Sequence, residues 1–275
     1  MSDTETTPVN VLQIDGSLGH QRQDVVAAED PLEIQIMGAQ IAVLMRTPGN
    51  DLDLVRGFLV TEKVVEHEEQ IRTIAHCETL TSPEAEDNVV RVVLQDSVDL
   101  DLERLKRNLF ATSSCGVCGK AAIENVISLT SPVDDDTRFA VSLLYNLPLQ
   151  LRDAQAVFDV TGGLHGAALF NSEGVLVCVR EDVGRHNAID KVIGWALEHG
   201  AVPLSGHILM VSGRVSFEVV QKACVAGLPL VAAVSAPTSL AVRTAEAMGV
   251  TLVGFLRGQR ANVYTHQERV TWQTS

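Results

Sequence analysis

The sequence predicts an α/β protein: a sheet covered by helices on both faces, preceded by a smaller α+β unit. After residue 164, short apolar runs alternate with helical patterns through short connections, as strands and helices do in such sheets. The runs Ile208–Val211 and Leu230–Val234 are almost wholly apolar, which is typical of strands buried on both faces. Before residue 110, apolar and polar residues alternate instead, which favours antiparallel strands with one face in solvent.

The smaller unit is expected to span residues 1–109. Its first eight residues are polar, and we expect them to form a disordered tail. Gly38 lies between two alternating runs and predicts a hairpin turn, while Asn50 or Asp51 can cap a helix. The expected elements are strand Val9–Ile14, hairpin strands Leu32–Met37 and Ile41–Arg46, a helix from 51 to about Val65, strands Ile71–Cys77 and Val89–Leu94, and helix Leu100–Leu109.

The larger unit is expected to span residues 110–275. It opens with a cysteine-containing loop and a helix over residues 120–127, followed by a polar break at 131–136. An amphipathic stretch, Val141–Phe158, is interrupted at Pro148. The remaining elements are expected to be hairpin strands Ala167–Phe170 and Val175–Val179, helix Ala188–Glu198, strand His207–Val211, helix Phe217–Ala226, strand Leu230–Val234, helix Leu240–Met248 and strand Thr251–Leu256.

Composition narrows the class of protein. With 275 residues and 46% apolar residues, the chain can bury a sizeable core. No signal peptide is apparent, and the longest apolar stretch, Leu228–Ala236, is far shorter than a membrane span, so we expect a soluble, cytoplasmic protein. A net charge of −14 argues against nucleic-acid binding. Because residues 178–275 carry nine basic and seven acidic residues, an anionic ligand is expected there rather than in the acidic first part.

The pair Cys115 and Cys118 lies in a turn of small residues just before a predicted helix. A helix N-terminus and the neighbouring Lys120 would both favour a thiolate. The pattern leaves several alternatives open: two unreactive thiols, a structural disulfide, half of a zinc site, or nucleophilic sulfur chemistry. The other three cysteines lie in apolar or alternating runs and are expected in the core: Cys77, Cys178 and Cys224.

Polar or glycine-rich segments follow the predicted strands of the larger unit, where α/β sheets bind ligands. Ser212, Gly213 and Arg214 follow a buried strand and suit a phosphate, and Arg257 and Arg260 flank a glycine near the last strand. Two histidines in such segments are candidates for proton transfer, although each has a structural alternative; His186 could pair with Asp182. The segments are 161–166, 180–187 (including His186), 212–216, 235–239 and 255–260, with His165 in the first.

Six motifs resemble those of one protein family: SSCGVCGK, DVTGGLHGAALF, REDVGRHNAIDKVIG, VSGRVSFEVVQKA, SAPTSLAV and GFLRGQRANVYT. They are similar to the formate dehydrogenase accessory sulfurtransferase family (FdhD), over about Met37 to Thr265. The resemblance implies a cytidine-deaminase-like three-layer α/β/α domain after a smaller domain. It also implies an enzyme that passes sulfur from a cysteine desulfurase to the molybdenum (or tungsten) bis(molybdopterin guanine dinucleotide) cofactor of formate dehydrogenase, and it suggests a homodimer.

The resemblance assigns roles to particular residues. Cys115 corresponds to the persulfide-carrying cysteine, with Cys118 as its partner. Zinc deaminase chemistry is not expected, because His165 is followed by Gly-Ala rather than x-Glu and the CxxC precedes it. Two other functions stay open: a non-catalytic chaperone for the molybdenum cofactor and a zinc-dependent hydrolase. The segment that corresponds to the family's cofactor-binding segment is Phe255, Leu256, Arg257, Gly258, Gln259 and Arg260.

Overall fold

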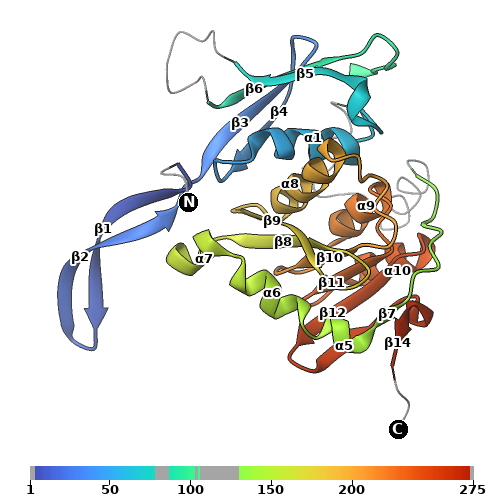
Figure 1. Ribbon diagram of the computed structural model, residues 1–275. Coiled ribbons are helices and arrows are strands. Elements are labelled where there is room, and N and C mark those ends of the chain that lie inside the picture. Colours follow the sequence, from blue (N-terminus) through green and yellow to red (C-terminus); the bar gives the residue numbers. More distant parts are fainter. Residues whose placement is uncertain (1–3, 78–86, 103–104, 106–129, 273–275) are drawn as a thin grey trace.

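The structure is a computed structural model that describes residues 4–77, 87–102, 105 and 130–272 (Figure 1). Its centre, within these residues, is a six-stranded sheet with the order β13-β12-β11-β10-β8-β9. The parallel strands β10, β11 and β12 are flanked by antiparallel neighbours on both sides, so the sheet is mixed. The strands are β8 (His165–Phe170), β9 (Leu176–Asp182), β10 (Ile208–Val211), β11 (Leu230–Ala233), β12 (Thr251–Arg257) and β13 (Arg260–Val263).

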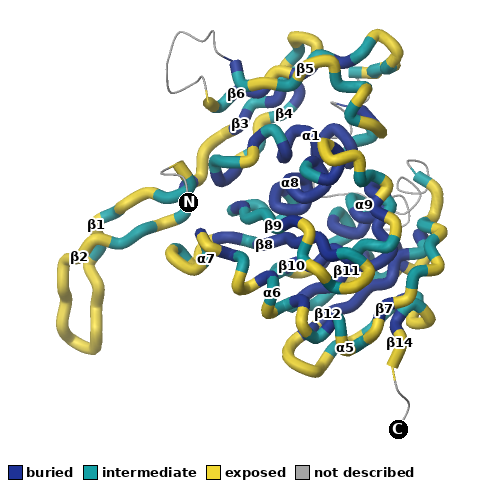
Figure 2. Tube along the Cα trace, viewed as in Figure 1, coloured by how far each residue is buried: buried dark blue, intermediate teal, exposed yellow. Residues whose placement is uncertain are grey.

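Helices cover both faces of this sheet, as the apolar strands predict. Alternate residues of β10 point to opposite faces: Leu209 and Val211 join one hydrophobic cluster, while Ile208 and Met210 join the other. All four are buried, which Figure 2 shows as the dark centre of the molecule. The first face packs on α8 (Arg185–Glu198), α9 (Phe217–Val225) and α10 (Ser239–Ala247), and the second on α5 (Val141–Leu144) and α6 (Leu147–Asp153).

A smaller sheet with the order β4-β3-β6-β5 lies at the other end of the molecule (Figure 1). Helix α1 (Asp51–Thr61) packs between this sheet and α8. The two helices meet at glycines, because a Cβ on Gly57 would collide with the backbone oxygen of Asp190, and one on Gly194 with that of Asp53. The strands are β3 (Asp30–Ile36), β4 (Ala39–Arg46), β5 (Ile71–His76) and β6 (Val89–Leu94).

The hydrophobic core runs without a break from the small sheet to the large one. Ile34 of β3 and Leu54 of α1 belong to the same buried cluster as Ile189 of α8 and Leu209 of β10. The predicted boundary between residues 109 and 110 lies outside the described residues, so the division into two domains stays a prediction. The cytidine-deaminase relationship also stays a prediction; what the structure shows is a mixed α/β fold with helices on both faces of its main sheet.

A two-stranded antiparallel arm extends away from the body (Figure 1). It consists of β1 (Thr6–Asp15) and β2 (Leu18–Ala27), paired from Thr6↔Ala27 to Asp15↔Leu18. The prediction of a disordered tail is therefore wrong for residues 6–8, while residues 1–3 lie outside the described part of the chain. The physical reason is pairing within a hairpin: β2 supplies hydrogen-bond partners that the polar composition of the tail does not reveal.

Several element boundaries also differ from the predictions. Helix α1 ends at Thr61 rather than near Val65, and Asn50 precedes it in a left-handed conformation (φ 55°) without a side-chain capping hydrogen bond. The stretch Val141–Phe158 forms α5, α6 and α7 (Ala156–Thr161), with Pro148 in the first turn of α6. The pairing of β7 (Phe139–Ala140) with β14 (Val270–Thr271) was not predicted. The helix predicted at 100–109 lies largely, and the one at 120–127 wholly, outside the described residues.

Candidate functional site

One edge of the main sheet collects all the predicted ligand-facing segments. This is the edge at which the parallel strands β10, β11 and β12 end. Because β8 and β9 are antiparallel, β8 begins there at His165 and β9 ends there at Asp182, in direct register with each other. The loops after Val211 and Ala233 and the turn at Gly258 complete the edge. The sheet order thus brings segments together that are up to 99 residues apart in the chain, from 161 to 260.

The loops of this edge are tied to one another by backbone hydrogen bonds. Val215 pairs with Pro237 in a parallel bridge, in which the Val215 amide donates to Ala236 (3.2 Å) and the Thr238 amide to Val215 (2.9 Å). The Phe255 amide donates to the Ser235 carbonyl (3.1 Å). The loops after β10 and β11 and the end of strand β12 are therefore linked to one another.

The first predicted phosphate segment is only partly free to bind. Ser212 is engaged with β8: its hydroxyl oxygen accepts from the Gly166 amide (2.9 Å), and its own amide donates to the Gly166 carbonyl (3.0 Å). Ser212 therefore holds β8 against the loop after β10. Gly213 lies beside His165, and Arg214 is exposed.

The second predicted segment, at the end of β12, presents most of its residues to solvent. Leu256 is the exception, because its side chain is fully buried in the second hydrophobic cluster. Arg257 is exposed, and its Nε donates to the Val234 carbonyl (3.0 Å), which places its guanidinium over the end of β11. Phe255 adopts a positive φ of 52° and is 43% exposed. The other exposed residues are Gly258, Gln259 and Arg260.

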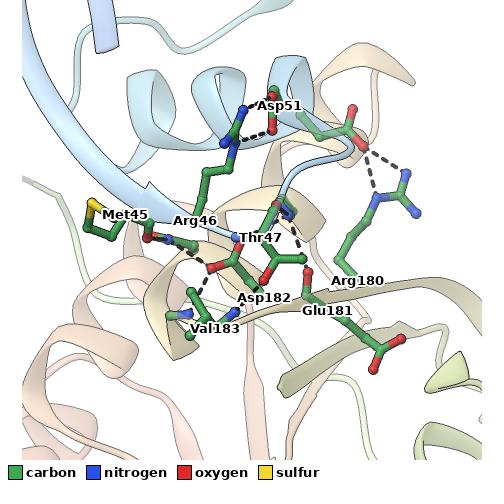
Figure 3. Close-up of polar contacts among 12 residues, drawn as sticks. Met45, Arg46, Thr47, Asp51, Arg180, Glu181, Asp182 and Val183 are labelled. Carbon is green, nitrogen blue, oxygen red and sulfur yellow. Dashed lines mark hydrogen bonds and ion pairs between the residues drawn. The ribbon is translucent and has the colours of Figure 1, made fainter. Parts of the chain in front are cut away.

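Asp182 fixes the turn that leads into α8 (Figure 3). Its side chain is fully buried, and its Oδ1 accepts from the Gly184 amide (2.8 Å) and the Asn187 side chain (2.9 Å). Its Oδ2 accepts from the Thr47 amide (3.2 Å) and pairs with Lys191 Nζ (2.8 Å). The predicted pairing of His186 with Asp182 is wrong, because the carboxylate is fully occupied beneath the turn.

Residues of the smaller unit also hold this turn in place (Figure 3). The Thr47 hydroxyl accepts from the Val183 amide (3.1 Å), and Lys191 Nζ also donates to the Thr47 carbonyl (2.8 Å). Nearby, Arg180 of β9 makes a close ion pair with Asp53 of α1 (2.7 Å). The end of β4 and the start of α1 therefore hold the segment 180–187 in place, a role that the sequence pattern did not reveal for Thr47, Asp53 or Lys191.

His186 lies instead against the loop after β10 and the first turn of α9. Its Nε2 is 3.2 Å from Glu218 Oε2 and 3.3 Å from Ser216 Oγ, and Ser216 Oγ donates to the same carboxylate (3.1 Å). The hydrogen bond from His186 lowers the pKa of Glu218 to about 2, so this carboxylate stays ionised. Burial, followed by the charges of Arg185 and His186, lowers the pKa of His165 below its ordinary value, which keeps that imidazole neutral at pH 7.

The cysteines divide into two groups. Cys115 and Cys118 lie outside the described residues. The prediction that Cys77, Cys178 and Cys224 are core residues is confirmed, since all three are buried free thiols. Burial raises the pKa of Cys178 to about 11 and that of Cys224 to about 12, so neither is a thiolate at neutral pH.

Neither a metal-binding cluster nor a helix suited to cross a membrane is present in the part of the chain that the structure describes. Residues 4–77, 87–102, 105 and 130–272 contain no group of three or more His, Cys, Asp or Glu side chains arranged to hold a metal ion. In the same part of the chain, no helix is long and apolar enough to cross a membrane.

Fold and site together define a mixed α/β protein with a preorganised, partly cationic edge at the ends of its parallel strands. Sequence comparison gives the family: the chain belongs to the FdhD/NarQ family, which it matches over residues 27–271. The resemblance seen in the motifs is therefore confirmed.

Relatives called sulfur carrier protein FdhD are similar over nearly the whole chain. The protein of Mycobacterium bovis is 50% identical over 256 residues, which cover 91% of this chain and 93% of the relative. That of Streptomyces avermitilis is 50% identical over 264 residues (94% of each), and that of Saccharolobus solfataricus 40% over 264 residues (95% and 96%).

A solved structure shares the fold. The crystal structure of a candidate formate dehydrogenase accessory protein from Desulfotalea psychrophila superposes with a TM-score of 0.75. It is 24% identical, and the match covers 97% of this chain and 99% of that one.

Proposed function

We propose that this protein is a cytoplasmic sulfur carrier that accepts sulfur from a cysteine desulfurase as a persulfide on Cys115. It passes this sulfur to the molybdenum bis(molybdopterin guanine dinucleotide) cofactor that formate dehydrogenase requires. In this proposal the chain acts as a sulfurtransferase, and the cofactor is its substrate rather than a resident group. A tungsten-containing form of the cofactor would be treated in the same way, because the recognised groups lie on the nucleotide.

One observation carries the proposal: relatives that are 50% identical over 91% or more of this chain are called sulfur carriers. The pair Cys115 and Cys118 lies inside the matched span of residues 27–271. The deep burial and raised pKa of Cys178 and Cys224 support the choice of this pair as the reactive one. The formate dehydrogenase client is supported by the family resemblance.

The chemistry of sulfur loading needs only a thiolate. Cys115 attacks the outer sulfur of the donor's persulfide, the donor's S–S bond breaks, and its electron pair leaves with the donor thiolate. Cys115 then carries the outer sulfur, with no net oxidation. Delivery can be driven by Cys118: its thiolate attacks the Cys115 sulfur of the persulfide, the S–S bond to the outer sulfur breaks, and that sulfur leaves at the sulfide level for the acceptor. The Cys115–Cys118 disulfide that this step forms is then reduced by a thiol or dithiol reductant before the next cycle.

The nucleotide end of the cofactor is proposed to dock on the edge of the main sheet. Arg257 and Arg260 are exposed cations on either side of Gly258, a position without a side chain that allows a large anion to approach the backbone. Phe255, two residues before Arg257 in the chain, offers an exposed ring for stacking on a base.

Sulfur loading is tested by intact-mass spectrometry after incubation with a cysteine desulfurase and cysteine. One added sulfur, removed by reductant and mapped to the peptide that contains Cys115, is expected. Cys115→Ala should abolish it, with Cys224→Ala as the matched control for a buried thiol. Loading that persists at normal yield in Cys115→Ala would contradict the assignment. A protein that never carries sulfur yet binds the cofactor would instead be the non-catalytic chaperone.

Docking is tested by calorimetry with GDP, with ADP as the control for the base. Arg260→Ala should weaken GDP binding by about 1.5–3 kcal/mol if its hydrogen bond is charge-assisted. The same variant should load sulfur at the normal rate, because the two sites share no residue.

The alternative of a zinc-dependent hydrolase is tested by metal analysis of the purified protein. About one zinc per chain that is lost in Cys118→Ala would favour this hydrolase.

A further inference from the structure

A cavity of about 1000 Å³ opens beside β13, on the face of the main sheet that carries the second hydrophobic cluster. Strand β13 supplies one wall, and residues of α5 and β14, which lie together in Figure 1, supply others. We call this cavity the β13 groove. Within the described residues its lining contains no Asp, Glu, Lys or Arg, and it consists mainly of apolar and aromatic side chains: Val141, Leu144, Tyr145, Val263, Val270 and Trp272.

The groove is continuous with the core of the protein. Leu144 and Val270 belong to the second hydrophobic cluster, and Ala261 and Val263 pack against it. Trp272, directly after β14, is 52% exposed although it lines the same cavity. A half-exposed tryptophan beside an apolar cavity is typical of a protein-binding surface, where aromatic side chains are enriched.

Strand β13 is an edge strand, so one side of its backbone has no neighbouring strand in the sheet. Asn262 is paired with β12, and the Tyr264 amide donates to the Leu252 carbonyl of β12 (2.8 Å). In an antiparallel pair such alternate residues bond to the neighbouring strand, and the residues between them direct their N–H and C=O groups the other way. Ala261 and Val263 therefore direct their backbone groups to the open edge of the sheet.

The two edges of the main sheet differ in how their backbone groups are used. At the other edge strand, β9, the Val179 carbonyl accepts from Arg180 Nη1 (2.9 Å) and the Glu181 carbonyl accepts from Lys191 Nζ (3.3 Å). At β13, the two outward-facing residues make no backbone hydrogen bond to another segment in the described part of the chain. An open edge of this kind is where an extended peptide can add to a sheet as a strand.

We propose that the β13 groove binds an extended segment of a partner protein, which adds to β13 as a further strand and places apolar side chains in the cavity. The open N–H and C=O groups of β13 select a peptide backbone, and the uncharged lining selects uncharged side chains. Every second residue of an added strand faces the same side of the sheet, so the segment should alternate apolar and polar residues. This surface is distinct from the proposed nucleotide docking, because neither Arg257 nor Arg260 lines it.

The probe is a set of capped peptides of about seven residues in which threonine alternates with leucine, isoleucine, valine or phenylalanine. A lysine at each end keeps the peptides soluble. The chain has two tryptophans, Trp195 and Trp272. The full-length Trp195→Phe protein therefore serves as the parent, because Trp272 in the groove is then its only tryptophan and its fluorescence reports binding.

Ala261→Pro tests the open edge. Proline has no N–H, so this change removes the outward-facing donor and no hydrogen bond to β12. Ala261→Val is the matched control, because it adds a side chain of similar size and keeps the N–H. Thermal unfolding shows whether each variant is folded.

The same bonds are tested from the side of the peptide, so the test does not depend on the folding of Ala261→Pro. Peptides are N-methylated at alternate residues, in either of the two possible registers. Only one register of an added strand directs its N–H groups to β13, whereas the other directs them to solvent.

We expect alternating peptides to change the Trp272 emission of the parent. Ala261→Pro should weaken this binding roughly tenfold or more, as the loss of a backbone hydrogen bond implies, and Ala261→Val should leave it unchanged. N-methylation should abolish binding in one register and preserve it in the other.

Three results would overturn the proposal: no peptide of the set binds the parent, a folded Ala261→Pro binds as tightly as Ala261→Val, or the two N-methylated registers behave alike. Light scattering tests a second copy of this chain as the occupant. A parent dimer that becomes a monomer in Ala261→Pro, together with no peptide binding, would assign the groove to that second copy instead. Sulfur loading at Cys115 is measured separately, so failure of this proposal leaves the sulfur carrier standing.

Discussion

The buried ion pair between Lys191 and Asp182 contributes to the stability of the folded protein. Both side chains are almost completely buried, and their atoms meet at 2.8 Å. Lys191→Met would leave the Asp182 carboxylate without its cation, and we expect it to lower the free energy of unfolding by about 3–5 kcal/mol. Urea denaturation measures this loss. Lys63→Met, which removes an exposed pair with Glu66, is the control and should change stability by less than about 1 kcal/mol. Equal effects of the two variants would contradict the role given to Lys191.

Glu218 makes a pH-dependent contribution to stability. Its pKa in the folded protein, about 2, lies below the ordinary value of 4.5, so the unfolded chain binds the proton more readily. The contribution is therefore fully present above pH 4.5 and is lost as the pH falls towards about 2. The parent should exceed Glu218→Gln in unfolding free energy by a constant amount above about pH 5, and this difference should shrink at lower pH.

Urea titrations between pH 3 and 7 test this dependence, with the exposed Glu173→Gln as the control. A difference between parent and Glu218→Gln that stays constant down to pH 3 would show that His186 does not depress the Glu218 pKa in solution.

Individual side chains were predictable where the local pattern determines them. The burial of Cys178 and Cys224 follows from their apolar runs. The partner of His186 could not be predicted, because Glu218 is 32 residues away and meets it only through the order of β8, β9 and β10 in the sheet. Arg185 likewise belongs to the segment 180–187, but the absence of a hydrogen-bond partner for its buried Nε is a property of the folded chain.

At the scale of elements, the crossing of α1 and α8 depends on its glycines. Alanine is favoured over glycine in a helix by about 1 kcal/mol, so Gly194→Ala would stabilise an isolated α8. In the folded protein the new methyl group would collide with the Asp53 backbone, and overpacking of this kind costs about 1–3 kcal/mol or more. We therefore expect net destabilisation, measured by urea unfolding.

Gly163→Ala is the control for this crossing, because its Cβ would meet nothing closer than 3.5 Å. A more stable Gly194→Ala protein would mean that the two helices do not pack at this distance.

The sequence predicts elements well where one pattern dominates. The hairpins β3–β4 and β8–β9, and the succession from α8 to β12, follow from periodicity and turn residues, and they are confirmed. Strand β2 was missed because its middle, residues 20–24, is polar throughout, so no alternation marks it. Strand β13 was not predicted because its four residues, Arg260–Val263, are too short a run to indicate a strand by themselves. In both cases pairing with a neighbouring strand creates the element.

At the scale of the whole molecule, the arm contributes little to the stability of the body. Its apolar residues Leu12, Ile14 and Leu18 are largely exposed (Figure 2), so they gain little from folding. Joining Thr7 directly to Val26 by an Asn-Gly turn preserves the pairing of these two residues and removes the outer arm. The free energy of unfolding should change by less than about 1 kcal/mol.

Urea unfolding of the shortened chain tests this expectation, with the parent as reference. A loss of several kcal/mol would show that the arm is packed on the body or on a second chain in solution. The homodimer suggested by the resemblance stays a prediction, and light scattering of the two proteins would measure it in the same series.

The backbone bonds between the loops of the binding edge have a consequence for exchange with deuterated solvent. The amides of Val215, Thr238 and Phe255 each donate to the neighbouring loop, so none can open without releasing a partner. A nucleotide that contacts only one loop should therefore slow deuterium uptake in all three, because closing one amide bond restrains the others. Deuterium uptake at these amides should therefore detect a bound ligand even at loops that the ligand does not contact.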